Sequence, residues 1–355
     1  MKTKIVIVDE NKIDAAVIEE AGQILKHGGL VAFPTETVYG LGGDALNETS
    51  SAKIYEAKGR PSDNPLIVHI AHMDFLAAIV EEVPNEAYRL AEKYWPGPLT
   101  MIFKKSGLVP YATTGGLETV AVRMPAHKTA QALIKAAGGY VAAPSANRSG
   151  RPSPTIAKYV IEDLDGRVDM IIDGGEVNIG LESTIIDLSG ENPMLLRPGY
   201  ITEEMLKETV GDVDVDRTLL DSESKEAPKA PGMKYRHYAP KGSLAVVEGT
   251  QQAVVSYINQ KIEESRKQGL KTGVIATDES ADSYLADVVK SVGSRKDENA
   301  IARHLFRILR EFDEESVQVM YAESFASQGI GQAIMNRLLK AAGHHVISVT
   351  DDNNE

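Results

Sequence analysis

The chain has 355 residues, with 38 basic and 51 acidic side chains, so its formal net charge is −13. An apolar content of 43% and a charged content of 25% are typical of a folded globular protein and exclude a disordered chain. At about 150 residues per domain, the length predicts two domains. The acidic balance excludes a general duplex-binding protein, because phosphate contacts require surplus Lys and Arg.

The chain contains no cysteine, which excludes disulfides, thiol nucleophiles, iron–sulfur clusters and cysteine zinc sites. The apolar run near the N-terminus is too short for a signal peptide, and no run of about 18 apolar residues follows it. We therefore expect no membrane span and a cytoplasmic location.

Residues 1–210 are expected to form an α/β domain. Helices are predicted at 13–27, 50–57, 85–94 and 129–137, and strands at 30–33, 66–70, 99–103, 120–123, 140–143, 170–173 and 183–187. Many strands with a few helices predict a twisted mixed sheet covered by helices.

Residues 211–240 are rich in polar residues and proline and show no amphipathic period, which predicts a linker. Residues 241–355 are expected to form a smaller domain. The apolar pattern predicts strands at 244–247, 272–276 and 317–321, and helices at 251–267, 282–292, 297–312 and 332–342. This order favours a parallel, Rossmann-like α/β sheet with helical cover.

One glycine-rich segment needs a separate test. Residues 40–45 match the loose dinucleotide pattern G-x-G-x-x-A. That motif requires a strand directly before it and a helix directly after it, whereas the preceding residues 34–39 look like a polar loop. The pattern is therefore not interpreted as a nicotinamide site.

Seven short segments are rich in Gly, Pro or side chains with a hydroxyl or amide group, and four of them carry a cation. They are 33–42, 58–66, 95–100, 122–125, 143–150, 182–187 and 196–199. Ordinary turns explain the Gly, Pro, Ser and Asn residues but not Lys58, Arg60, Arg123 and Arg197. Cations at strand ends of an acidic domain indicate a small ligand that carries phosphate.

These segments resemble the YrdC-domain family, and the whole chain is similar to the long, two-domain form of threonylcarbamoyl-AMP synthases. The sequence PGMKYRHYAP at 231–240 resembles the linker of that form, and GIGQAIMNR at 329–337 resembles its second domain. The resemblance implies a YrdC-like catalytic domain at 1–210, a linker or lid at 211–240 and a Rossmann-like domain at 241–355.

The resemblance implies that L-threonine, CO2 or bicarbonate, and ATP with Mg2+ give L-threonylcarbamoyl-AMP and pyrophosphate. A separate transferase would place the threonylcarbamoyl group on adenosine 37 of ANN-decoding tRNAs, and no stable nucleic-acid binding is expected of this chain. No magnesium ligand is singled out, although Glu36, Asp44 and Asp187 are possible.

The family's site residues are carried over by motif. Lys58 and Arg60 would be catalytic. The nucleotide would be held by Lys58, Ser62, Asn64, Thr119, Ser145, Asn147, Ser153 and Arg197, and in the linker by Tyr235 and Tyr238. Threonine would be framed by Thr35, Tyr39, His69, Arg123, Ala143 and Ser183, with Arg123 on its carboxylate.

Three other functions remain open at this point. A non-catalytic RNA-binding module would use the basic loops without releasing pyrophosphate. A carbamoyl-transfer subunit of hydrogenase maturation would share the YrdC-like domain but would carry cysteine-rich zinc modules, which this chain lacks. In an interaction protein, the C-terminal part would bind a partner and the first domain would be inert. Such a protein would have no need of Lys58, Arg60, Ser145, Asn147 and Arg197 in the first domain.

Overall fold

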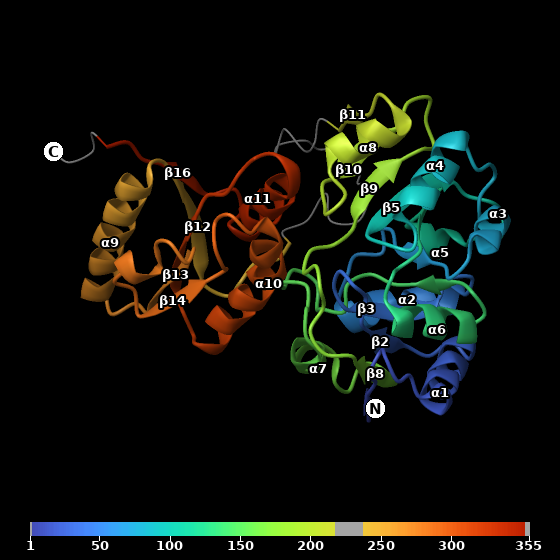
Figure 1. Ribbon diagram of the computed structural model, residues 1–355. Helices are drawn as coiled ribbons and strands as arrows, with labels where there is room; N and C mark the ends of the chain where they lie inside the picture. The colour runs from blue at the N-terminus through green and yellow to red at the C-terminus, as the bar shows by residue number, and fades with distance from the viewer. Residues whose placement is uncertain (1, 217–236, 352–355) are drawn as a thin grey trace. The chain divides into compact units, whose positions relative to one another are not determined.

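The computed structural model describes residues 2–216 and 237–351. The chain divides into two compact units (Figure 1). Unit 1 comprises Met1–Ser149 and Ser153–Tyr235, and unit 2 comprises Gly150–Pro152 and Arg236–Glu355. No helix among the described residues is long and apolar enough to cross a membrane.

Unit 1 is built on an 11-stranded mixed sheet in the order β1-β8-β2-β3-β7-β4-β6-β5-β9-β10-β11. Its strands are β1 (Lys4–Ile7), β2 (Val31–Phe33), β3 (Gly40–Asp44), β4 (Ile67–His69), β5 (Leu99–Lys104), β6 (Thr119–Arg123), β7 (Val141–Ala142), β8 (Met170–Asp173), β9 (Thr184–Asp187), β10 (Met194–Arg197) and β11 (Asp214–Val215). Its α-helices are α1 (Ala15–Lys26), α2 (Glu48–Lys58), α3 (Leu76–Ile79), α4 (Asn85–Tyr94), α5 (Tyr111–Thr114), α6 (Lys128–Ala136), α7 (Ala157–Leu164) and α8 (Glu203–Val210), and a 3-10 turn, η1 (Met73–Phe75), precedes α3.

Two apolar layers stabilise unit 1. Helices α1 and α6 pack together and bury Leu25 and Leu133 against Phe33 of β2. A larger core holds Ile54 of α2 and Leu90 of α4 against strands such as β5. The sheet therefore lies between helices, as expected for a mixed α/β domain.

The start and end of α2 matter for the site. Asn47 caps its N-terminus by accepting a hydrogen bond from the Thr49 backbone N–H. Gly59 ends the helix with φ +62°, a left-handed conformation that glycine adopts without steric penalty. Lys58, the last helical residue, is thereby placed at a sharp turn.

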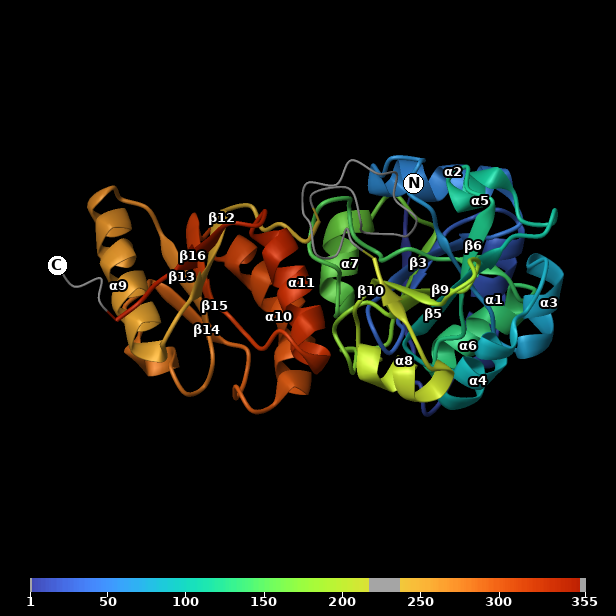
Figure 2. The ribbon, with the colours of Figure 1, turned by 90° about the horizontal axis from the view of Figure 1, so that it is seen from above.

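Unit 2 contains a five-stranded, fully parallel sheet in the order β14-β13-β15-β12-β16. Helix α9 covers one face of this sheet, and α10 and α11 cover the other (Figures 1 and 2). Its elements are β12 (Ser243–Glu248), α9 (Gln251–Lys267), β13 (Thr272–Ala276), η3 (Ala281–Ser283), β14 (Val288–Ser291), α10 (Glu298–Glu314), β15 (Val319–Glu323), α11 (Gly329–Ala341) and β16 (Val346–Ser348). The predicted fold class is confirmed.

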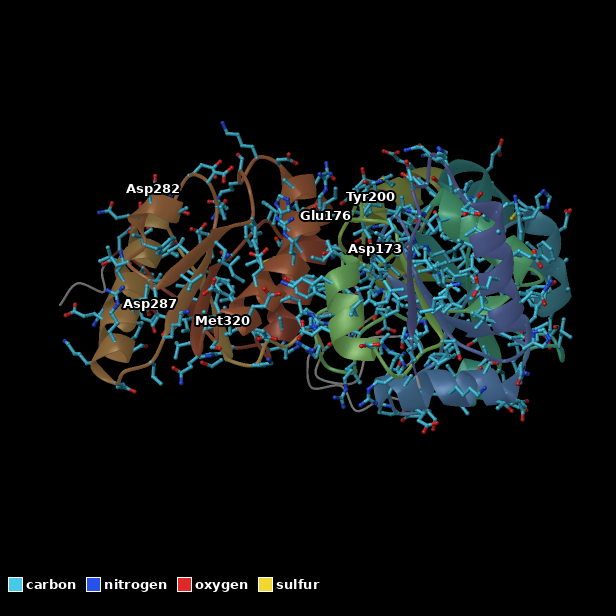
Figure 3. The ribbon with its side chains drawn as sticks, turned by 90° about the horizontal axis from the view of Figure 1, so that it is seen from below. Asp173, Glu176, Tyr200, Asp282, Asp287 and Met320 are labelled. Atoms are coloured by element: carbon cyan, nitrogen blue, oxygen red, sulfur yellow. The ribbon has the colours of Figure 1, made fainter. Side chains whose placement is uncertain are left out.

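One local expectation needs correction and another is confirmed. The segment 282–292 is not a helix, because its second half is strand β14, paired in parallel with β13. Asp287 (labelled in Figure 3) accepts hydrogen bonds from the Thr272 backbone N–H and hydroxyl, both at 2.8 Å, and so holds this segment beside β13. The glycine-rich pattern at 40–45 is mostly strand β3, which confirms that it is no dinucleotide turn.

Candidate active site

The buried side chain of Lys58 joins two motifs that are distant in sequence. Its Nζ donates hydrogen bonds to the backbone carbonyls of Ser145 at 2.5 Å and Asn147 at 2.6 Å. The Ser145 hydroxyl donates to Asn147 Oδ1 at 2.5 Å, and the Ser149 N–H donates to the Lys58 carbonyl at 2.9 Å. The structure therefore brings together three residues predicted to bind ATP.

The loop between α2 and β4 carries Arg60, predicted to be catalytic, and the predicted nucleotide residues Ser62 and Asn64. Arg60 donates from Nε to the Asn64 carbonyl at 3.2 Å and from Nη2 to the Pro65 carbonyl at 3.0 Å. Asn64 is buried, and its Oδ1 has no hydrogen-bond donor among the residues that the structure describes. Ser62 is exposed. Thr119 begins β6, which runs parallel to β4 and starts at the same end of the sheet as this loop.

Arg123 is the centre of the predicted threonine group. It is only 4% exposed and forms a 2.6 Å ion pair from Nη2 to Glu36 Oε1. Its Nη1 donates to the Thr37 hydroxyl at 2.9 Å and its Nε to the Gly97 carbonyl at 3.2 Å. The Thr35 hydroxyl lies 2.9 Å from that of Thr37. The loop 34–39 therefore supplies both the charge and the hydroxyls around this guanidinium group.

His69 stands directly opposite Arg123 on the neighbouring parallel strand. Burial, reinforced by the charge of Arg123, lowers the pKa of His69 to about 3. Its Nδ1 lies 3.1 Å from the Ile67 carbonyl, so Nδ1 carries the proton and Nε2 is an acceptor. His69 is thus a neutral ring beside a cation.

Ser183 links two further strands to this region. Its hydroxyl lies 2.7 Å from that of Thr100, which is paired with Arg123 across β5 and β6. Arg197 donates from Nε to the Ser183 carbonyl at 3.0 Å and from Nη2 to its hydroxyl at 3.2 Å. A predicted nucleotide residue and a predicted threonine residue are therefore in direct contact.

Two other predicted residues are buried in unit 1. The backbone N–H of Ala143, just after β7, donates to the Ile67 carbonyl at 2.9 Å on the strand that carries His69. Ser153 donates from its hydroxyl to Glu182 Oε1 at 2.6 Å, next in sequence to Ser183. The contact of Ala143 with threonine and that of Ser153 with the nucleotide stay predictions.

Tyr39 has a structural role that motif reasoning did not anticipate. Its side chain is fully buried, and its hydroxyl donates to the Gly175 carbonyl at 2.6 Å and accepts from the Gly174 N–H at 3.1 Å. Burial raises the pKa of Tyr39, and the nearby carboxylate of Asp173 (labelled in Figure 3) raises it further. Its contact with threonine stays a prediction.

The two linker tyrosines differ in what the structure describes. Tyr235 lies outside the described residues. Tyr238 belongs to unit 2, where its buried ring lies 4.8 Å from the ring of Phe306 between centroids. The predicted contact of either tyrosine with the nucleotide stays a prediction.

The three carboxylates considered as magnesium ligands do not gather. Glu36 pairs with Arg123, whereas Asp44 accepts from the Leu46 N–H and Asp187 accepts from Ser189 in their own turns. Across the described ranges, no group of three or more His, Asp or Glu side chains is arranged to hold a metal ion.

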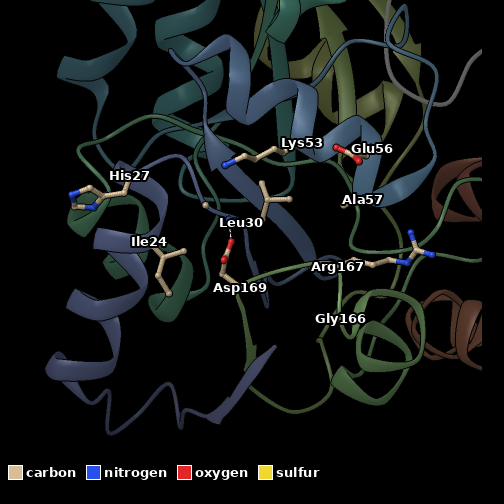
Figure 4. A pocket seen from close by; sticks show the side chains of 10 residues that line it. Ile24, His27, Leu30, Lys53, Glu56, Ala57, Gly166, Arg167 and Asp169 are labelled. Carbon is tan, nitrogen blue, oxygen red and sulfur yellow. Dashed lines mark hydrogen bonds between the residues drawn. The ribbon is translucent and has the colours of Figure 1, made fainter. Parts of the chain in front are cut away.

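A separate pocket of about 670 Å³ lies beside α1 and α2 (Figure 4). Two of its charged residues make structural contacts: Lys53 donates to the Gly28 carbonyl at 2.6 Å, and Asp169 accepts from the Leu30 N–H at 2.8 Å. None of the predicted site residues lines it. It is therefore distinct from the candidate active site.

Motif reasoning missed Thr37, Thr100 and Glu182, which contact Arg123, Ser183 and Ser153 respectively. All three lie inside the segments singled out in the sequence. Their polar side chains beside or within buried strands could have marked them as candidates. The sequence could not show which residues they contact, because those residues are distant along the chain.

Two family models match consecutive parts of the chain. The Sua5/YciO/YrdC family model, described as telomere recombination, matches residues 23–199. A second model, described as the C-terminal domain of threonylcarbamoyl-AMP synthase, matches residues 201–343.

Similar proteins cover nearly the full chain. The threonylcarbamoyl-AMP synthase of Pyrococcus abyssi is 48% identical over 97% of this chain and 99% of its own. That of Bacillus subtilis is 49% identical over 98% of this chain and 100% of its own. The crystal structure of Pyrococcus abyssi Sua5 complexed with L-threonine matches with a TM-score of 0.93 at 48% identity, over 98% of this chain and all of that one. The chain belongs to the threonylcarbamoyl-AMP synthase family.

Proposed function

We propose that this chain forms L-threonylcarbamoyl-AMP and pyrophosphate from L-threonine, bicarbonate or CO2, and ATP. The observation that carries the proposal is the Lys58 group, in which a buried ammonium group is fixed by the carbonyls of Ser145 and Asn147. Family membership supplies the reaction class, and the group supplies a cation at the predicted ATP motifs.

The proposed chemistry has two steps. The α-ammonium group of threonine first loses a proton, and the resulting amine nitrogen attacks the carbon of CO2 or bicarbonate and forms a carbamate; from CO2 a second proton is released, and from bicarbonate water is released. A carbamate oxygen then attacks the α-phosphorus of ATP, and pyrophosphate leaves with the electrons of the broken P–O bond. Because an anion approaches a triphosphate, positioning and charge neutralisation supply the catalysis.

In this proposal the two groups of residues have separate tasks. Lys58 and Arg60 contact the phosphates and neutralise the charge that develops there, assisted by the predicted nucleotide residues around them. Arg123 pairs with the threonine carboxylate. The free Nε2 of neutral His69 is suited to accept a hydrogen bond from the threonine hydroxyl. The contact between Ser183 and Arg197 joins the two tasks.

Magnesium enters this proposal as part of the ATP substrate. Mg2+ keeps several waters and commonly binds through nucleotide phosphates with one or two protein carboxylates. The separated positions of Glu36, Asp44 and Asp187 fit an ion that is held mainly by phosphate.

The product is a mixed anhydride, so a separate transferase must consume it. We propose that this transferase acts on adenosine 37 of ANN-decoding tRNAs, that this chain binds no nucleic acid stably, and that it works in the cytoplasm. The net charge of −13 supports the absence of stable binding.

Pyrophosphate release tests the proposal. We expect release that requires ATP, L-threonine and bicarbonate together and that falls by about 100-fold or more in Lys58→Met. Lys53→Met is the matched control, because Lys53 lies on the same helix and contacts only the Gly28 carbonyl in the described structure. Release without threonine would contradict the proposal. Salt-sensitive tRNA binding without any release would support the RNA-binding alternative.

A further inference from the structure

Glu36 carries a buried carboxylate oxygen that faces no donor. The residue is 7% exposed, and its Oε1 is bound to Arg123 Nη2 at 2.6 Å. Its Oε2 is buried and has no hydrogen-bond partner among the described residues. A buried charged oxygen without a donor is strongly unfavourable, which indicates a ligand that supplies one.

The nearby histidine does not supply that donor. His127 is close enough for its charge to couple to Glu36. However, its Nδ1 accepts from the Thr129 N–H at 3.2 Å, so its proton is on Nε2. That nitrogen lies 3.7 Å from Glu10 Oε2. The donor for Glu36 Oε2 must therefore come from elsewhere.

The charges around Glu36 specify what the ligand looks like. Glu36 and Arg123 together form a neutral ion pair, and His69 opposite Arg123 is uncharged because its pKa is far below neutrality. Of the five N–H donors of Arg123, three are engaged with Glu36, Thr37 and Gly97, and within the described ranges the other two are available to a ligand. The ion pair has no net charge, and it offers an acceptor on Glu36 Oε2 beside N–H donors on Arg123. This arrangement suits a zwitterion, which has both a cationic and an anionic group, better than it suits a simple anion.

We propose that Glu36 Oε2 binds the α-ammonium group of the amino-acid substrate, while the remaining donors of Arg123 bind its carboxylate. This inference rests on the proposed function, since it uses threonine as the occupant of the Arg123 group. Glu36 is then a substrate-binding residue that selects an α-amino acid over a hydroxy acid and fixes the nitrogen that becomes the carbamate nitrogen.

Binding measurements with two ligands test the inference. The ligands are L-threonine and (R)-3-hydroxybutyrate, which keeps a carboxylate and a β-hydroxyl but lacks the amine. The proteins are the full chain, Glu36→Gln and Thr37→Val, each studied by isothermal titration calorimetry. Thr37→Val is the matched control, because it removes another support of Arg123 without touching the carboxylate.

We expect Glu36→Gln to weaken L-threonine binding by about 10- to 100-fold, because a charge-assisted hydrogen bond is lost. Binding of 3-hydroxybutyrate should change less than threefold in Glu36→Gln. Thr37→Val should weaken both ligands by similar factors, because it loosens Arg123 and Thr35 and both ligands keep the carboxylate and the hydroxyl.

The outcomes separate the two proposals. If the unaltered chain binds no L-threonine, the proposed function itself is wrong. If L-threonine binds and Glu36→Gln weakens both ligands equally, Glu36 acts only by holding Arg123, and the inference is overturned. Circular dichroism spectra and melting curves of each variant establish that it is folded before titration.

Discussion

His69 shows how the fold determines the charge of a single side chain. Its pKa is lowered to about 3, so the folded protein keeps the ring neutral while the unfolded chain protonates it below about pH 6.5. The stabilisation from this neutral ring is fully present above pH 6.5 and is lost as the pH falls toward 3. Acidification should therefore favour the unfolded chain.

We expect the free energy of unfolding to fall by about 2 kcal/mol more in the unaltered chain than in His69→Gln between pH 7 and pH 5. Urea denaturation at the two pH values measures this difference. Equal losses in both proteins would show that folding does not lower the pKa of His69.

The hydroxyl of Ser183 is shared by Thr100 and Arg197. Its removal in Ser183→Ala should lower the free energy of unfolding by about 1–2 kcal/mol, because two buried polar groups lose a partner. The KM for threonine should rise as well. Ser189→Ala is the control at the other end of β9, where the hydroxyl contacts only Asp187 in the described structure. An effect of equal size on KM there would refute a specific role for Ser183.

At this scale, the sequence identified the cations but not their partners. Arg123 was singled out by its motif, yet its ion pair with Glu36 joins residues 87 positions apart. Nothing local decides which side chains share a buried space. Tyr39 illustrates the same limit, because its hydroxyl is occupied by a backbone 136 residues further on.

Among the elements, the C-terminal end of α2 affects both the stability of the fold and the positions of the site residues Lys58 and Arg60. Gly59 has φ +62° and no atom within 4 Å of an added Cβ, so Gly59→Ala should cost about 1–2 kcal/mol through backbone conformation alone. The same strain displaces Lys58 and Arg60, and the KM for ATP should rise. Gly269→Ala, at φ +71° after α9 and equally open, should cost similar stability.

Urea denaturation and ATP kinetics on both glycine variants make this comparison. An unchanged KM for ATP in Gly59→Ala, with stability lost as expected, would show that Lys58 keeps its position without this turn.

The elements that sequence patterns predicted well have long apolar faces, such as α1, α9 and α10. The errors concern short segments. Strand β14 has only four residues, and its pairing depends on Asp287 contacting Thr272 across the sheet. Strand β3 is rich in glycine, and Gly42 has space only for a hydrogen because Phe33 and Val141 approach closely. Such contacts belong to the assembled sheet and are not visible as a local period.

On the scale of the whole molecule, unit 2 includes a short piece from late in the first half of the chain, Gly150–Pro152. Arg310 of α10 is 1% exposed and donates to the Pro152 carbonyl from Nε at 3.0 Å and from Nη2 at 2.6 Å. The Ala239 N–H donates to the Gly150 carbonyl at 2.9 Å. The segment Gly150–Pro152 lies in the sequence between Asn147 and Ser153, which were both predicted to bind ATP.

Arg310→Met should lower the free energy of unfolding by about 1–3 kcal/mol, because the buried Pro152 carbonyl loses a charged donor. Backbone amides at 149–155 should exchange faster with solvent. Hydrogen exchange followed by mass spectrometry measures both the local and the global effect. Arg303→Met, exposed on the same helix, should change stability less. Unchanged exchange at 149–155 would mean that Arg310 does not support this segment.

The capture of Gly150–Pro152 also sets an order of events during synthesis. Pro152 leaves the ribosome 158 residues before Arg310, so the segment that follows Asn147 waits for its partner until most of the chain has been made. A nascent chain that stops before α10 has every motif of the first half but lacks this support. The contacts of Gly150–Pro152 are therefore completed late in synthesis, although the segment itself is translated in the first half of the chain.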